Sequence, residues 1–327
     1  MANATVSRLG LVNNTGTNFD ELFLKVFSGE VLTSFTRNNI FNEQLHSVRT
    51  IASGKSASFP VLGAATGAYH TVGTPLVGAN QIKANEKIIT IDDLLISQAF
   101  VAQIDELKNH YDVRATYADE LGKALAKQYD INVAKVIANA SRTSTTLSGG
   151  NGGTVLTLAS GNTNSAAVTG DELAAAIYDI AQTFDERDIP TTDRFCVLPP
   201  AEYYKLAETA TRTVDTDFNP QGNGSFASGK IQQIAGIPVM MSNSVPQTNR
   251  SAVTGENNTY SGDDSKTIGL VFHKSAVGTV KLMDMKTEIS GSDYNLMYQG
   301  TLMIAKYLLG HGVLRPECAA TIKLSAS

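Results

Sequence analysis

The chain has 327 residues, which is long enough for about two domains with hydrophobic cores of their own. Hydrophobic residues make up 42% of it, which excludes a wholly disordered chain, and only 17% of its residues are charged, against roughly 25% in an average soluble domain. Because few charges leave little repulsion between copies, this composition favours a surface that faces other protein.

The net charge of −5 comes from 26 Lys plus Arg and 31 Asp plus Glu, without the basic run that DNA-binding domains use. We therefore expect contact with DNA to be weak and non-specific. Cys196 and Cys318 lie far apart in apolar settings, which predicts two buried thiols in a reducing compartment. No signal peptide is evident at the N-terminus, and the most apolar tract, residues 302–309, is too short to span a membrane.

The chain begins with a segment that we expect to be an arm. Residues 1–18 carry few large apolar side chains and are expected to be mobile. Residues 19–35 place large apolar side chains, Phe23 and Phe27 among them, at helical spacing. An apolar helix on such an arm indicates a partner surface.

Residues 49–62 and 81–91 are rich in β-branched and aromatic positions and flank a glycine-rich stretch, which predicts one long β-hairpin. Twelve extended residues reach roughly 40 Å at ~3.3 Å each. An isolated two-stranded ribbon is only marginally stable in water, so we expect this hairpin to lie against a neighbouring subunit.

The next segment carries the clearest helical pattern of the chain. From Phe100 to Ala140, apolar residues recur at steps of three and four, and no proline interrupts them. We predict one helix over residues 112–141, about 45 Å long at ~1.5 Å per residue, with a break near residues 109–112.

Composition changes to Ser, Thr, Gly and Asn over residues 141–168, which we interpret as the boundary of a second domain. A capping box of Thr169 and Glu172 opens a helix that carries apolar residues as far as Phe184 and ends before Pro190. The remaining predicted elements are strands at residues 194–198, 234–242, 267–272, 278–285 and 300–309, and short helices at residues 203–206 and from Arg315. The last three strands are expected to return to the first domain.

No motif in the sequence supports catalysis. Residues 54–56 end like a phosphate-binding loop, but Arg49 stands where its first glycine belongs, and residues 222–227 match a dinucleotide motif in letters without following a strand. Glu106 and His110 are only two ligands, too few for zinc. We therefore predict no catalytic, cofactor-binding or metal site, and a protein that is not an enzyme.

Six blocks, spread in order along the chain, carry a family resemblance. They are residues 22–35 (LFLKVFSGEVLTSF), 53–63 (SGKSASFPVLG), 86–92 (EKIITID), 109–114 (NHYDVR), 268–282 (IGLVFHKSAVGTVKL) and 305–317 (AKYLLGHGVLRPE). Together these blocks resemble the major capsid protein of T7-like short-tailed phages. The first twenty residues and residues 142–266 match this family poorly.

The resemblance implies an α+β chain with the HK97-like capsid fold. Its parts would be an N-terminal arm at residues 1–48, an E-loop hairpin at 49–91, a peripheral domain with a spine helix at 92–141, an axial domain at 142–266, and the returning peripheral strands at 267–327.

The resemblance also implies a function: the head shell of a short-tailed double-stranded DNA bacteriophage. Copies would form hexamers and pentamers of an icosahedral head, assemble with a scaffolding protein and a portal protein in the cytoplasm of the bacterial host, and enclose the genome in the virion without touching a membrane. We expect no covalent crosslink between copies. The predicted contacts between subunits are Phe23, Phe27, Arg49, Lys55, Phe59, Pro60, Tyr69, Lys83 and Lys87.

Three alternatives remain open at this stage. An encapsulin-like nanocompartment shell protein would share the fold but form small, uniform, cargo-loaded shells without DNA or portal. An enzyme with its site in residues 142–266 would need acids or histidines there, and that region has no histidine. An adhesive surface protein would suit the Thr and Asn content but would need a signal peptide.

Overall fold

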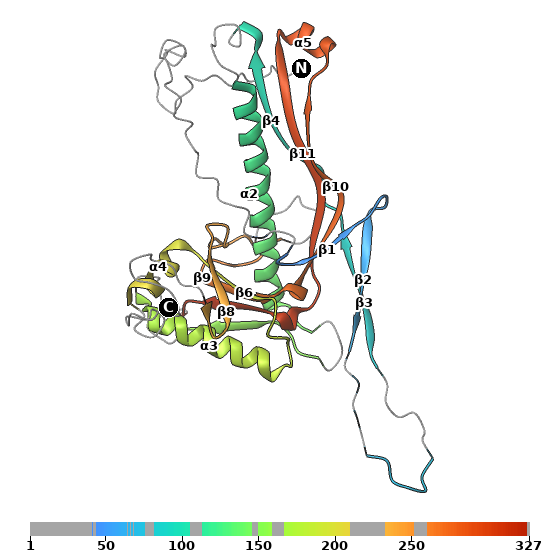
Figure 1. Cartoon of the computed structure of the whole chain (residues 1–327), viewed down its shortest axis with the longest axis vertical. Helices are drawn as coiled ribbons and strands as arrows, with labels where there is room; N and C mark the ends of the chain where they lie inside the picture. The colour runs from blue at the N-terminus through green and yellow to red at the C-terminus, as the bar shows by residue number, and fades with distance from the viewer. Residues whose placement is uncertain are drawn as a thin grey trace, which may run out of the picture. The chain divides into compact units, whose positions relative to one another are not determined.

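The computed structural model describes residues 41, 44–63, 65, 67, 69–75, 82–104, 113–145, 150–158, 167–209, 233–251 and 260–325. The described chain divides into two compact units (Figure 1). The first unit contains Asp93–Tyr129 and Met283–Leu309, and the second contains Ile40–Asp92, Asp130–Leu282 and Gly310–Ser327. The helix predicted over residues 19–35 and the break predicted near residues 109–112 lie outside the described residues.

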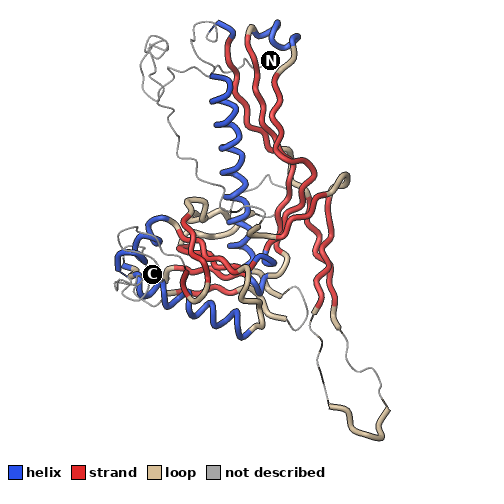
Figure 2. The backbone as a smooth tube through the Cα atoms, in the orientation of Figure 1, coloured by secondary structure: helices blue, strands red, loops and turns tan. Residues whose placement is uncertain are grey.

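Helix α2, Val113–Arg142, is 30 residues long and runs without a break (Figure 2). The sequence predicted it within one residue at each end. Its C-terminal half belongs to the second unit and is almost fully buried, with Val133, Val136 and Ile137 at most 2% exposed. Burial of this apolar face, rather than helix propensity alone, stabilises so long an element.

In the first unit, strand β4, Leu95–Ala102, pairs antiparallel with strand β11, Gly300–Val313. The helical pattern that starts at Phe100 is therefore wrong over its first residues. Phe100 packs in the unit's core, where a Cβ on Gly300 would lie 2.4 Å from its ring. Helix α5, Ser292–Tyr298, which the sequence did not predict, connects strand β10, Val277–Ile289, with β11.

The predicted hairpin is present in the second unit as strands β2, Ser56–Leu62, and β3, Ala84–Thr90. They form a two-stranded antiparallel sheet in register from Ser56 opposite Thr90 to Leu62 opposite Ala84. The hairpin starts later than expected, because residues 49 and 50 belong to strand β1, Ser47–Thr50, which pairs parallel with β10.

The second unit also holds a six-stranded sheet of order β5-β12-β9-β6-β8-β7. These strands are β5 (Thr154–Thr157), β12 (Ala319–Lys323), β9 (Thr267–His273), β6 (Arg194–Leu198), β8 (Ile237–Met241) and β7 (Gln233–Ile234). Helices α3, Gly170–Glu186, and α4, Pro200–Thr209, pack together beside it, and the 3-10 turns η2, Lys274–Ala276, and η3, Pro316–Cys318, precede β10 and β12.

Helix α3 begins as predicted. The Thr169 hydroxyl accepts a hydrogen bond from the Glu172 backbone N–H, and the Glu172 carboxylate accepts one from the Thr169 N–H, at 2.9 Å. The residues predicted to face the core, including Leu173 and Phe184, are fully buried. Local capping and spacing therefore suffice to predict this helix from the sequence, and burial of its apolar face stabilises it.

Three details of this sheet differ from the prediction. Residues 234–242 form two short strands because Ala235 and Gly236 adopt positive φ angles of 51° and 73° and turn the chain back. The prediction returns the strands after residue 266 to the first domain, but β9 pairs with β6 and β12 pairs with β5. Strand β5 lies in the polar stretch that we interpreted as a domain boundary. Its partner β12 is over 160 positions away, so the sequence near β5 contains no signal for a strand.

No helix among the described residues combines the length and apolarity that a membrane crossing requires.

Candidate functional site

The hairpin exposes large apolar side chains to solvent. Leu62, Tyr69, Val72, Ile82 and Ile88 are 69%, 107%, 93%, 56% and 61% exposed, and we refer to these five residues as the hairpin surface. Scattered single apolar residues on a surface are ordinary, but several along one thin ribbon indicate a surface that another protein covers.

The predicted contact residue Arg49 holds the start of the hairpin. Its guanidinium donates a hydrogen bond to the Ser58 carbonyl and lies 5.9 Å from the centre of the Phe59 ring. Phe59, half-buried under this cation, stands opposite Lys87 in the hairpin register. The structure therefore brings together three of the predicted residues, namely Arg49, Phe59 and Lys87.

The other predicted contact residues are distributed along the ribbon. Lys55 is exposed at the root, where its carbonyl accepts a hydrogen bond from the Ile91 N–H at 2.9 Å. Lys83 is exposed at the far end of the paired region, and Pro60 and Tyr69 are exposed between and beyond these positions. Pro60 fits β2 because a two-stranded sheet leaves each strand one unpaired edge. Phe23 and Phe27 lie outside the described residues.

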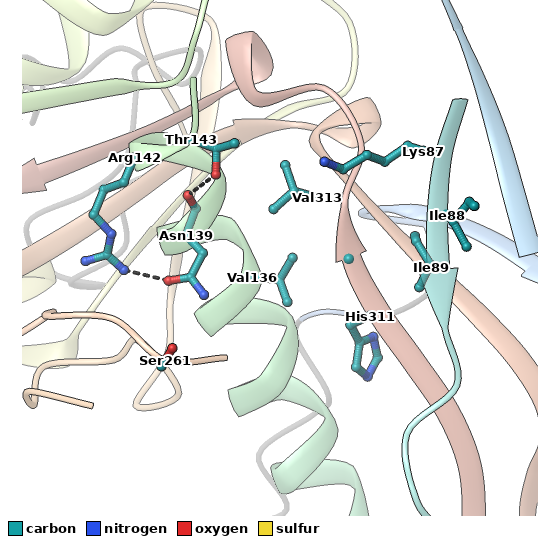
Figure 3. A pocket seen from close by; sticks show the side chains of 11 residues that line it. Lys87, Ile88, Ile89, Val136, Asn139, Arg142, Thr143, Ser261, His311 and Val313 are labelled. Atoms are coloured by element: carbon teal, nitrogen blue, oxygen red, sulfur yellow. Dashed lines mark hydrogen bonds between the residues drawn. The ribbon is translucent and has the colours of Figure 1, made fainter. Parts of the chain in front are cut away.

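An open pocket of about 440 Å³ lies beside the hairpin root (Figure 3). Lys87 and Ile89 of the hairpin, Val136 and Arg142 of α2, and His311 of β11 line it. No cluster of three metal-ligating side chains occurs in the part of the chain that the structure describes.

The two buried thiols, Cys196 and Cys318, are unreactive at neutral pH. Desolvation raises the pKa of Cys196 to about 12, and burial also raises the pKa of Cys318. Because the thiolate is the reactive form, both side chains act at neutral pH as small core residues, as the sequence predicted.

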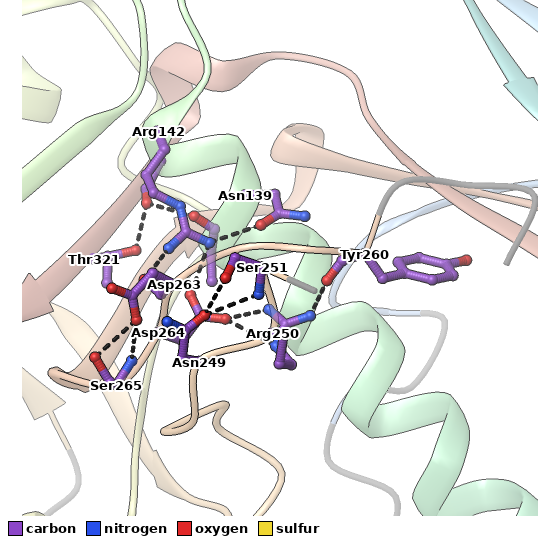
Figure 4. A network of polar contacts seen from close by, with 12 residues as sticks. Asn139, Arg142, Asn249, Arg250, Ser251, Tyr260, Asp263, Asp264, Ser265 and Thr321 are labelled. Carbon is purple, nitrogen blue, oxygen red and sulfur yellow. Dashed lines mark hydrogen bonds and ion pairs between the residues drawn. The ribbon is translucent and has the colours of Figure 1, made fainter. Parts of the chain in front are cut away.

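A network of buried polar groups lies at the C-terminal end of α2 (Figure 4). Asp264, with no exposed surface, pairs with Arg142 at 2.7 Å and with Arg250. The Arg250 guanidinium also donates to the carbonyl of Tyr260. A buried carboxylate between two guanidiniums keeps all three charges paired, which is the condition under which charges are tolerated inside a protein.

A second group of polar residues meets at the hairpin root. The Tyr260 hydroxyl donates to the carboxylate of Asp92, and it accepts a hydrogen bond from the His311 backbone N–H at 3.3 Å. The His311 imidazole lies 2.9 Å from the Thr279 hydroxyl, and desolvation, followed by the nearby His46, lowers the pKa of His311 to about 3. His311 is therefore neutral at physiological pH.

Tyr260 and His311 could not be identified from the sequence, because the groups that they join are far apart in the chain. Leu296 and Met297 of α5, which are exposed in the first unit, were not predicted either. Their spacing resembles that of any short helix, so no pattern distinguishes them.

Comparison with known proteins identifies the family. A family model described as Gp10A-like major capsid protein matches residues 58–323. The chain is 34% identical to the major capsid protein of Escherichia phage T7 over 334 residues, covering 92% of this chain and 91% of that protein. It is 33% identical to the major capsid protein of Enterobacteria phage T3 over 324 residues, covering 93% and 91%.

Solved structures agree with the sequence relatives. The capsid structure of the Cyanophage P-SCSP1u matches with a TM-score of 0.83 and 48% identity over 100% of both chains. The mature capsid of bacteriophage PhiM1 matches with a TM-score of 0.72 over 98% of this chain and 97% of that one, and at 20% identity it supports the fold alone. The predicted α+β, HK97-like capsid fold is confirmed.

These matches also decide between the alternatives. The relatives are phage capsid proteins, so the nanocompartment alternative is not favoured, and the family is structural rather than enzymatic. The location that these relatives indicate is the capsid shell of a virion. The chain therefore belongs to the Gp10A-like family of phage major capsid proteins.

Proposed function

We propose that copies of this chain form the hexamers and pentamers of an icosahedral phage head, and that the hairpin of each copy is clamped by its neighbours. The observation that carries this proposal is the hairpin surface: a two-stranded ribbon with five exposed apolar side chains. Because a two-stranded ribbon alone is only marginally stable, a partner that covers these side chains would stabilise it.

The contacts between copies would include Arg49, Lys55, Phe59, Pro60, Tyr69, Lys83 and Lys87 on the hairpin and Phe23 and Phe27 on the arm. The arm would span residues 1–48 and the E-loop segment 49–91. The peripheral domain would hold residues 92–141 with the returning strands β10 and β11, and the axial domain would hold residues 142–266 with β9 and β12, which pair with its strands. A shell needs many weak contacts repeated over a lattice, and protruding segments that adjust to slightly different neighbours provide them.

Partners other than the chain itself would be a scaffolding protein and a portal protein, with assembly in the cytoplasm of the bacterial host. The enclosed double-stranded DNA would touch the shell weakly and without sequence preference. A subunit charge of −5 supports this, because a negatively charged shell repels phosphates and releases its genome readily.

A shortened hairpin tests the proposal. Because Leu62 stands opposite Ala84, replacing residues 63–83 by Asn-Gly closes the ribbon with a two-residue turn and leaves the seven strand pairs in place. We expect the variant to fold, by circular dichroism and urea unfolding, but to form no closed particles in negative-stain electron micrographs. Closed particles in wild-type yield would contradict the proposal.

Two neighbouring residues provide a matched control. Ile88 is exposed and Ile89 is 2% exposed, although they are adjacent in the same strand. Ile88→Ser should leave the unfolding free energy of the subunit nearly unchanged and reduce particle yield, whereas Ile89→Ser should destabilise the subunit itself by about 2–5 kcal/mol. Equal effects of the two changes on subunit stability would argue against an interface on the exposed face.

A further inference from the structure

Tyr260 occupies an unusual position between three elements of the second unit. Its side chain is 2% exposed, and its hydroxyl contacts two distant segments at once: the side-chain carboxylate of Asp92, two residues after β3, and the backbone N–H of His311 in β11. Its own carbonyl accepts a hydrogen bond from Arg250. One residue thus contacts the hairpin root, the long strand β11 and the loop that carries Arg250.

The contacts continue from that loop to the end of α2. Arg250 donates to Asp264 through Nε at 3.0 Å, and Asp264 pairs with Arg142, the last residue of α2. Asn139, one turn earlier in α2, accepts a hydrogen bond from the same Arg142 guanidinium at 2.7 Å. Figure 4 shows this order, with the ring of Tyr260 pointing away from the arginine and aspartate cluster.

The hairpin root also packs closely against strand β11. A Cβ added at Gly310 of β11 would lie 2.1 Å from the Thr90 carbonyl oxygen and 2.9 Å from the Ile91 Cα. A Cβ at Gly312 would lie 2.8 Å from the side chain of Ile89. The root therefore packs directly against the glycine backbone of β11, and this contact is steric and not directional.

We propose that Tyr260 is a positioning residue that ties the root of the hairpin to the C-terminal end of α2, so that its hydroxyl group, together with the contacts of Arg49 and the pairing of β1 with β10, sets the hairpin's direction from the second unit's core. A hydrogen bond to a carboxylate is strong and directional, whereas the contact of the root with Gly310 and Gly312 is only steric. This inference rests on the proposed function for its biological meaning, because a clamp between copies must point in one direction. Its physical content does not depend on shell formation.

Tyr260→Phe removes the hydroxyl and keeps the ring. We expect amide hydrogen exchange of residues 84–92 in the purified full-length protein to become about tenfold or more faster, while the amides of β6 and β9 keep their wild-type rates. Tyr204→Phe is the matched control, because that hydroxyl is on a 55% exposed side chain of α4, and it should change neither region.

Asp92→Asn provides the second variant and keeps an oxygen acceptor while it removes the charge. We expect a smaller acceleration at residues 84–92, and in the Tyr260→Phe background the change should add little, because both substitutions break the same contact. If Tyr260→Phe does not fold, Asp92→Asn alone must still produce the local effect.

Unchanged exchange at residues 84–92 in Tyr260→Phe would overturn the inference. Equal acceleration at the hairpin root and in β6 and β9 would overturn it too, because that is the signature of a group that only contributes to overall stability. Failure of the wild-type chain to form shells would instead overturn the proposed function and leave the exchange result standing.

Discussion

Replacing Gly310 by alanine is expected to displace the hairpin root and prevent shell formation. The added methyl group would lie 2.1 Å from the Thr90 carbonyl oxygen and 2.9 Å from the Thr90 carbonyl carbon and the Ile91 Cα. Ordinary contact at a Cβ begins near 3.4 Å, so the root must move by more than 1 Å. All three atoms belong to backbone, which cannot rotate out of the way as a side chain could.

The size of the effect follows from this geometry. Forcing an extra methyl group into a packed site costs typically about 1–3 kcal/mol, and the upper part of that range applies here because the neighbouring atoms are backbone. Gly310 is not in the left-handed region, so the expected loss is steric and not conformational. A displacement at the root also changes the direction of the whole hairpin. We therefore expect a large loss of particle yield together with only a moderate loss of unfolding free energy in the subunit.

Urea unfolding of the purified subunit and sedimentation of the expressed particles measure the two effects separately. Gly67→Ala is the matched control: it lies on the same hairpin, and no atom stands within 4 Å of its added Cβ. That variant should match the wild type in unfolding free energy. If Gly310→Ala also matches the wild type in both stability and particle yield, the close seat of the hairpin on β11 is refuted.

Three further predictions concern subunit stability. Asp264→Asn removes the buried carboxylate that pairs with the charges of Arg142 and Arg250 and should lower the unfolding free energy in urea by about 3–5 kcal/mol. His311 has a pKa of about 3 in the folded state and near 6.5 in the unfolded state, so between pH 6.5 and pH 5 only the unfolded chain binds a proton at this side chain. The unfolding free energy should therefore fall by about 2 kcal/mol from pH 6.5 to pH 5. Thr169→Ala removes the capping box of α3 and should cost about 1 kcal/mol, measured by the same unfolding curves.

Each of these predictions has a comparison that isolates its cause. Lys306→Ala breaks the more exposed pair with Glu288 and should cost less than about 1 kcal/mol, so a similar loss in Asp264→Asn would contradict the role of burial. His311→Gln should flatten the pH dependence, and an unchanged slope would assign the titration to other groups. Thr169→Ser keeps the hydroxyl and should behave as the wild type.

The elements that the sequence predicted well are those fixed by neighbours in the chain. Helix α2 follows from apolar residues at steps of three and four, and α3 follows from its capping box. The hairpin follows from two extended segments around a glycine-rich stretch. In each case the residues that form the element also contain its signal.

The elements that were missed depend on distant partners. β4 has a pattern compatible with a helix, and only its pairing with β11, some 200 positions later, makes it a strand. Residues 49 and 50 of β1 are predicted as part of the hairpin and residues 47 and 48 as part of the arm, because the parallel partner β10 is equally remote in the sequence. The contact of Tyr260 with Asp92 joins residues 168 positions apart and could not be inferred from spacing. Gly310 and Gly312, which flank His311, are the sequence signal for that site, because glycines within a strand mark a close approach of another backbone.

Electron cryomicroscopy of shells assembled from the full-length chain tests the central claim most directly. The account predicts that Leu62, Ile82 and Ile88, exposed on the single chain, are buried against a neighbouring copy in the shell. Shells in which these three side chains face solvent would contradict it.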